Sequence, residues 1–164
     1  VLRRTWNGNG GVLLMGTRSN IAYQNENKSM DVMYCHYDGY LDHNGRILLE
    51  HYNNEEDARA LVDNGYARSL KPTVKEINED RVNKDKPETY KSLGNYMNGN
   101  VDTLFIEFIY LWRKGQWWIA WNSSVETPDG FHPRVYYHTE FKSLKKELEN
   151  WDADNFGEAG VQFE

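Results

Sequence analysis

The sequence predicts a single α+β domain, in which an antiparallel sheet of about five strands carries about three helices. Three observations indicate this fold. Two aromatic-rich runs separated by a short polar break lie between Asp102 and Asn122, shorter stretches alternate between apolar and polar residues, and other stretches show helical spacing of apolar residues. At 164 residues the chain is long enough to bury a core without a metal or a disulfide.

The aromatic stretch predicts a β-hairpin around which the rest of the chain is organised. With Lys114 and Gly115 as its two turn residues, Trp112 faces Trp117, and every other pair in the hairpin follows from that register. Both faces of the hairpin are then apolar. It therefore belongs in the middle of a sheet that is covered on both faces, or it is covered on one face and uses the other to bind a partner.

The first half of the chain predicts a two-stranded hairpin followed by two helices. Residues alternate in polarity over 19–24 and 31–37, which is typical of half-buried strands. Apolar residues at helical spacing then predict helices over 46–52 and 54–64. Asn54 is suited to cap the second helix because acidic residues fill the first turn after it.

The second half of the chain is more polar before the aromatic hairpin and regular again after it. Apolar residues are sparse from 69 to 100, so we expect at most a marginal helix over 73–82 and a short helix over 89–97. Alternation over 134–141 predicts the third strand of an aromatic meander. Ser143 then caps a final helix.

Composition and charge exclude several classes of function. The net charge is −6 and the isoelectric point is near 5.4, so duplex nucleic acid is an unfavourable partner. No apolar run approaches the roughly 20 residues of a membrane span. The single cysteine, Cys35, cannot form an internal disulfide, which fits a reducing compartment. We therefore expect a cytoplasmic protein that has no membrane contact and needs no cofactor.

Residues 1–14 differ in composition from the rest of the chain. The codons for Gly10 and Gly11 can contain a purine-rich ribosome-binding sequence, and Met15 follows at the spacing of a start codon. Our hypothesis is that residues 1–14 are a translated leader, with a disordered N-terminal arm as the alternative. Residues 15–164 would then form the α+β domain.

Two blocks of sequence resemble a family of small uncharacterised proteins found in bacteriophages, prophages and some bacteria. Members begin with Met-Gly-Thr-Arg-Ser/Ala, matched here by residues 15–19, and carry His-Trp/Tyr-Asp-Gly-Tyr, matched here by residues 36–40. Gly45 and residues 48–52 continue the similarity, and residues 110–117 resemble a hairpin of those proteins. The resemblance implies a phage-type origin and no particular reaction.

The first functional interpretation is a phage-type accessory protein in the cytoplasm of an infected bacterium. It would bind and inhibit a host macromolecule, such as a polymerase, nuclease or defence complex, without catalysis. Exposed aromatic residues would anchor the partner, and acidic residues would occupy a basic groove. These acids lie near the C-terminus and, as Glu55, Glu56 and Asp57, on the second predicted helix. The candidate binding residues are Trp112, Trp117, Trp121, Tyr136, Arg18, His36, Asp38, Tyr40, Glu147 and Glu149.

Two alternatives stay open. The aromatic sheet face could stack the bases of single-stranded nucleic acid. Alternatively, His36, Asp38 and His43 could hold a metal ion for hydrolysis, although their spacing matches no established metal motif and the pattern favours structural roles, with Asp38 in the turn that ends the strand. We expect Arg18 to be held by an acid such as Asp38 or Glu50. Because the chain contains no phosphate-binding, nucleophile or zinc-protease motif, we assign no catalytic residue.

Overall fold

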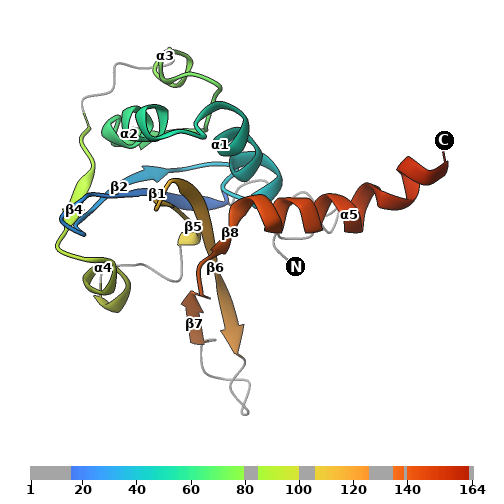
Figure 1. Cartoon of the computed structure of the whole chain (residues 1–164). Helices are drawn as coiled ribbons and strands as arrows, with labels where there is room; N and C mark the ends of the chain where they lie inside the picture. The colour runs from blue at the N-terminus through green and yellow to red at the C-terminus, as the bar shows by residue number, and fades with distance from the viewer. Residues whose placement is uncertain (1–15, 80–84, 100–105, 126–134, 139, 163–164) are drawn as a thin grey trace.

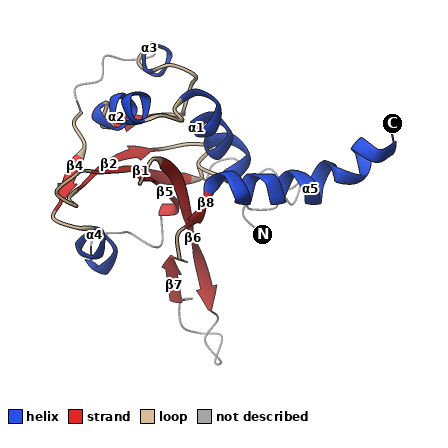
Figure 2. Ribbon diagram, viewed as in Figure 1, coloured by secondary structure: helices blue, strands red, loops and turns tan. Residues whose placement is uncertain are grey.

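The computed structural model describes residues 16–79, 85–99, 106–125, 135–138 and 140–162, which form an α+β fold built on one mixed sheet (Figures 1 and 2). The strands are β1 (Arg18–Gln24), β2 (Met30–Cys35), β3 (Tyr66–Ala67), β4 (Glu88–Tyr90), β5 (Ile106–Arg113), β6 (Gln116–Val125), β7 (Val135–His138) and β8 (Lys142–Ser143). They lie in the order β3-β2-β1-β5-β6-β7, with β4 paired to β2 and β8 paired to β6.

The helices connect these strands and cover the sheet. They are a short π-helical turn, η2 (Leu41–Gly45), and the α-helices α1 (Arg46–His51), α2 (Glu55–Asp63), α3 (Val74–Ile77), α4 (Leu93–Gly99) and α5 (Leu144–Gln162). Helices α1, α2 and α3 lie on one side of the sheet and α4 lies on the other (Figure 2). None of the helices in the described part of the chain is long and apolar enough to cross a membrane.

The predicted aromatic hairpin is confirmed, with its register. Trp112 pairs with Trp117, and Arg113 pairs with Gln116, so Lys114 and Gly115 form a two-residue turn between β5 and β6. Both turn residues have positive φ, 53° and 76°. Positive φ at both positions is typical of the two-residue hairpin turn whose geometry matches the twist of the flanking strands. β7 pairs antiparallel with β6 and completes the predicted meander.

The prediction of a purely antiparallel sheet of about five strands is wrong. β1 pairs with β5 in parallel, β2 pairs with β3 in parallel, and the sheet has more strands than predicted. The parallel pairs join segments that are separated by long connections, and turn chemistry in the sequence predicts only the pairs closed by a short hairpin. β3, β4 and β8 have two or three residues each, which is too short to produce an alternating pattern.

The polar stretch before β5 also differs from expectation in detail. The marginal helix expected over 73–82 is the single turn α3, whose N-cap Thr73 accepts a hydrogen bond from the backbone of Glu76. The start of the helix expected over 89–97 is strand β4, which pairs with β2, and α4 begins only at Leu93. The tertiary contact with β2 therefore decides the structure of a segment whose helix propensity is weak.

Two apolar clusters fill the two faces of the sheet. Alternate residues of β5 belong to different clusters, because Tyr110 packs under α1 and α2 whereas Ile109 and Leu111 face α4. The first cluster also receives Leu144 and Leu148 from the start of α5. The central hairpin is therefore covered on both faces, which is the first of the two arrangements that its sequence allowed.

Candidate functional site

The two sequence blocks that carry the family resemblance pack against each other. The backbone N–H of Gly39 donates to the carbonyl of Thr17 at 2.8 Å, and the hydroxyl of Tyr110 donates to the carbonyl of Gly39 at 2.6 Å. A Cβ at Gly39 would lie 2.8 Å from both the Thr17 oxygen and the Ser19 Cβ. Only glycine allows this close approach. The shared motifs therefore fix the turn after β2 onto β1.

A buried polar network lies beneath this turn. The Asn44 side chain donates to the hydroxyl of Ser19 at 3.1 Å and to the sulfur of Cys35 at 3.5 Å, and its oxygen lies 2.9 Å from Nδ1 of His43. Burial raises the pKa of Cys35 to about 11, so the thiol stays protonated and is a weak nucleophile. These residues form a structural network in the core.

The proposed metal ligands are held by different partners. Asp38, which has a positive φ of 59°, accepts a hydrogen bond from Ser69 at 3.2 Å, whereas His43 belongs to the buried network and His36 contacts Tyr34. Within the described ranges, no three His, Cys, Asp or Glu side chains gather in a way that could hold a metal ion. The described residues therefore offer no metal site for the hydrolase alternative.

Arg18, Tyr34 and His36 form a connected group where β1 begins and β2 ends. The Arg18 guanidinium hydrogen-bonds the hydroxyl of Tyr34, which lies 2.6 Å from Nδ1 of His36. Burial lowers the pKa of His36, and the positive charges of Arg18 and Arg68 lower it further. The imidazole is therefore neutral near pH 7, and one of its two nitrogens, Nδ1, is committed to the hydrogen bond with Tyr34. Arg18 thus bonds to a tyrosine, whereas Asp38, one of the acids expected to hold it, accepts from Ser69.

This arrangement predicts a pH dependence of stability. The folded-state pKa of His36 lies below its unfolded value, so the unfolded chain binds a proton first as the pH falls below about 6.5. The free energy of unfolding should therefore fall between about pH 7.5 and about pH 5.5, and His36→Gln should reduce that fall. Urea denaturation at the two pH values measures it, with the exposed His51→Gln as the control. An unchanged pH dependence in His36→Gln would contradict the assignment.

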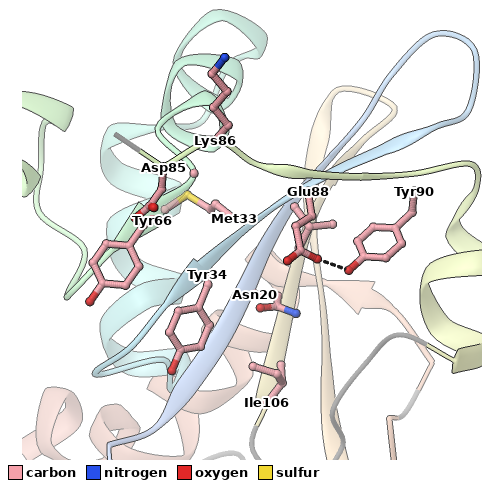
Figure 3. Close-up of a pocket in the computed structure, with 11 residues that line it drawn as sticks. Asn20, Met33, Tyr34, Tyr66, Asp85, Lys86, Glu88, Tyr90 and Ile106 are labelled. Carbon is pink, nitrogen blue, oxygen red and sulfur yellow. Dashed lines mark hydrogen bonds between the residues drawn. The ribbon is translucent and has the colours of Figure 1, made fainter. Parts of the chain in front are cut away.

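A cleft of about 440 Å³ opens beside this group, on the sheet face that carries the second apolar cluster (Figure 3). Tyr34 belongs to both the group and the cleft. The polar and aromatic lining residues are Asn20, Tyr34, Tyr66, Asp85, Lys86, Glu88 and Tyr90. Sequence reasoning missed this cleft because most of these residues come from β3, β4 and the segment before β4, where it predicted no strand.

The aromatic candidates of the hairpin are mainly core residues. Trp112 and Trp117 are only 5% and 1% exposed and pack edge-to-face with ring centroids 5.4 Å apart. Trp121 is half-buried, with the Lys142 ammonium 5.2 Å from its ring centroid. The side chain of Tyr136 lies outside the described residues. Stacking of nucleobases needs open ring faces. Trp112 and Trp117 are therefore not available for the single-stranded nucleic-acid alternative.

The acidic candidates lie on α5, which leaves the body of the protein (Figure 1). Its first turns pack through Leu144 and Leu148, and Asp152 accepts a hydrogen bond from Arg46 at 2.8 Å. Glu147 is half-buried and Glu149 is exposed. Tyr40, the remaining candidate, is half-buried against the first cluster, with its ring centroid 6.0 Å from that of His43.

No family model, curated protein or solved structure matches this chain. The similarity to phage proteins therefore stays a prediction from the motifs. The motif residues Thr17, Ser19 and Gly39 have clear structural roles in this fold, because they hold the turn after β2 against the start of β1.

Proposed function

We propose that this is a phage-type accessory protein that binds and inhibits a host protein without catalysis, and that α5 is its recognition element. The observation that carries the proposal is the position of α5, whose second half projects away from the sheet (Figure 1). Asp154 is exposed there, and Phe156 is 56% exposed. The expected partner presents a basic groove with an apolar pocket, such as a nucleic-acid-binding site.

The projecting part of α5 gains little stability from its own sequence. Isolated helices shorter than about 12–15 residues are marginal in water, and Gly157 and Gly160 each cost about 1 kcal/mol relative to alanine. The first turn, where the helix dipole favours acids, holds Lys145 and Lys146 beside the single acid Glu147, and the last turn has no basic residue. Contact with a partner would stabilise this part of α5, which neither packing nor the distribution of charges along the helix does.

The chemistry of α5 suits a basic partner. Acidic side chains on an exposed helix attract a basic surface over distances of about a Debye length, which speeds association. A large aromatic residue can act as an apolar anchor, and such anchors supply most of the binding energy of an interface. Phe156 offers this, since its side chain is 56% exposed and, among the residues that the structure describes, its ring pairs with that of Trp151 at a centroid distance of 5.6 Å. The acidic side chains and the aromatic anchor Phe156 thus lie on the same exposed helix.

Affinity capture from a lysate of the bacterial host tests the proposal. Wild-type protein should retain a partner at low salt and release it as the ionic strength rises. The double variant Glu149→Lys/Asp154→Lys, and separately Phe156→Ala, should reduce the retained amount by about tenfold or more. The matched control is Glu55→Lys/Glu56→Lys, which reverses two exposed acids on α2 and should leave capture unchanged. Equal losses in both charge variants would show that α5 has no specific role.

A further inference from the structure

We propose that the cleft beside Tyr34 is a binding site for an aliphatic amine, whose ammonium group lies among Glu88, Asn20 and the tyrosine rings. The amine is a free polyamine or the lysine side chain of a peptide, since both carry the same primary ammonium group. This site lies on the sheet, away from α5, and the inference does not depend on the proposed partner of that helix (Figure 3).

The strand registers bring the lining side chains to one face of the sheet. Asn20 on β1 pairs with Tyr34 on β2, and Tyr34 pairs with Tyr66 on β3, so these three residues form a row across three strands. Glu88 on β4 pairs with Val32 on β2, and Val32 precedes Tyr34 by two positions, which places this pair in the next row of the same face. A row of two tyrosines and an amide therefore lies beside a row that carries a carboxylate.

Two side-chain oxygens at the cleft receive no hydrogen bond from the described residues. Nδ2 of Asn20 donates to the hydroxyl of Tyr96 at 2.6 Å, which fixes the amide and leaves Oδ1 on the side of Tyr34 (Figure 3). Oε2 of Glu88 accepts from the hydroxyl of Tyr90, which fixes the carboxylate and leaves Oε1 to accept from a ligand. Both open positions are acceptors, so the cleft favours a ligand that donates hydrogen bonds.

The charges at the cleft favour a cation. The carboxylate of Glu88 keeps its charge in the bond to Tyr90, because burial raises the pKa of Tyr90 to about 12 and the bond and charge of Glu88 contribute to that rise. The other charged lining residues are the acid Asp85 and Lys86, whose ammonium Figure 3 shows directed away from the cleft. A primary ammonium group has one positive charge and three donors, so it matches a carboxylate oxygen and an amide oxygen together.

The tyrosine row supplies a surface for the cation and its alkyl chain. The ring centroids of Tyr34 and Tyr66 are 6.1 Å apart with an interplanar angle of 36°, and both side chains are half-buried, so each keeps part of its surface open. The face of an aromatic ring attracts an ammonium group within about 6 Å of its centroid. Val32 and Ile106 add apolar surface to the lining, along which methylene groups pack. This lining suits a cation on an aliphatic chain better than a compact inorganic ion.

The size of the cleft fits such a chain. Its volume of about 440 Å³ lies within the range of about 300–1,000 Å³ that small-molecule sites occupy. The residues that line it come from β1, β2 and β5 in the sheet, and from β3 and β4 at its border. The two acceptors and the two rings of the tyrosine row are all on strands, which hold them in fixed relative positions.

Isothermal titration of the full chain with spermidine near neutral pH tests this site. Spermidine should bind with a Kd at or below about 1 mM, whereas a neutral diol of similar length should give no heat of binding. Glu88→Gln should weaken binding about tenfold, because it keeps the shape of the side chain and removes its charge. The matched charge control is Glu56→Gln, which removes one exposed acid from α2 on the other side of the sheet and should bind as the wild type does.

The aromatic contact is tested at Tyr66. Tyr66→Leu should weaken spermidine binding about threefold or more, whereas Tyr66→Phe should keep it, because the ring supplies the contact. A lysine tripeptide in the same titration distinguishes the two sources of the ammonium group. Tighter binding of the peptide than of spermidine assigns the site to a lysine side chain, and weaker binding assigns it to a free polyamine.

Three outcomes would overturn the proposal. The first is no heat of binding for spermidine or the peptide at about 10 mM. The second is an equal loss in Glu88→Gln and Glu56→Gln, which would show only a general attraction of cations to an acidic chain. The third is binding that Tyr66→Leu leaves unchanged in a variant that unfolds at the wild-type urea concentration. Glu88 is exposed, so Glu88→Gln should fold, and it decides even if Tyr66→Leu does not.

Discussion

Trp117→Ala should lower the free energy of unfolding by about 3–5 kcal/mol, the range for truncating a large aromatic residue in a core. The Trp117 side chain is 1% exposed, and its Nε1 donates to the carbonyl of Tyr52 at 2.9 Å. Truncation therefore leaves a cavity against Trp112 and a buried carbonyl without its donor. Urea denaturation monitored by circular dichroism measures the loss.

The neighbouring tryptophan supplies the control. Trp118 lies on the opposite face of β6, is half-buried, and donates from Nε1 to the carbonyl of Arg113 at 2.9 Å. Its sequence position predicts a core residue with a loss of several kcal/mol on truncation, and its partial exposure now predicts a smaller loss than at Trp117. A larger loss in Trp118→Ala than in Trp117→Ala would contradict the assignment of the two faces.

Gly65→Ala is the second change with a large expected effect. Gly65 ends the turn after α2 with a φ of +73°, and a Cβ there would lie 2.6–2.7 Å from three backbone atoms of Lys86. Left-handed strain of about 1–2 kcal/mol would add to an overpacking cost of about 1–3 kcal/mol. The backbone of Lys86 cannot rotate away as a side chain could, so the segment leading into β4 must move.

Chemical denaturation and amide hydrogen exchange measure this effect together. The variant should unfold at a lower urea concentration, and the amides of β4 should exchange faster than in the wild type. Gly115→Ala is the matched control, because that glycine also has positive φ, +76°, but its Cβ would meet no atom within 4 Å. Equal destabilisation by the two variants would show that the approach of Lys86 contributes nothing beyond the backbone conformation.

The parts of the fold that could be predicted are those that short-range chemistry specifies. A two-residue turn at Lys114 and Gly115, flanked by alternating aromatics, leaves one register for β5 and β6, and that register is observed. Asn54 likewise caps α2 by accepting from the backbone of Asp57. The parallel pairing of β1 with β5 has no such local signal, because it depends on how distant segments pack.

The same distinction holds for the candidate sites. The sequence identified His36, Asp38 and Arg18 as neighbours of a motif, and the acids of α5 as a cluster, because each set is close in sequence. It could not show that helices cover Trp112 and Trp117, or that Tyr66 lies beside Tyr34. Those facts depend on long-range packing, which short-range patterns do not encode.

Amide hydrogen exchange of α5, in the free protein and in the complex captured from host lysate, tests the central claim most directly. We predict that amides from residue 153 onward exchange rapidly in the free protein, because that part of α5 projects away from the sheet (Figure 1), and become protected by at least about tenfold in the complex. Amides of α2 should not change. Protection that appears on α2 or the sheet while α5 continues to exchange rapidly would contradict the assignment of α5 as the recognition element.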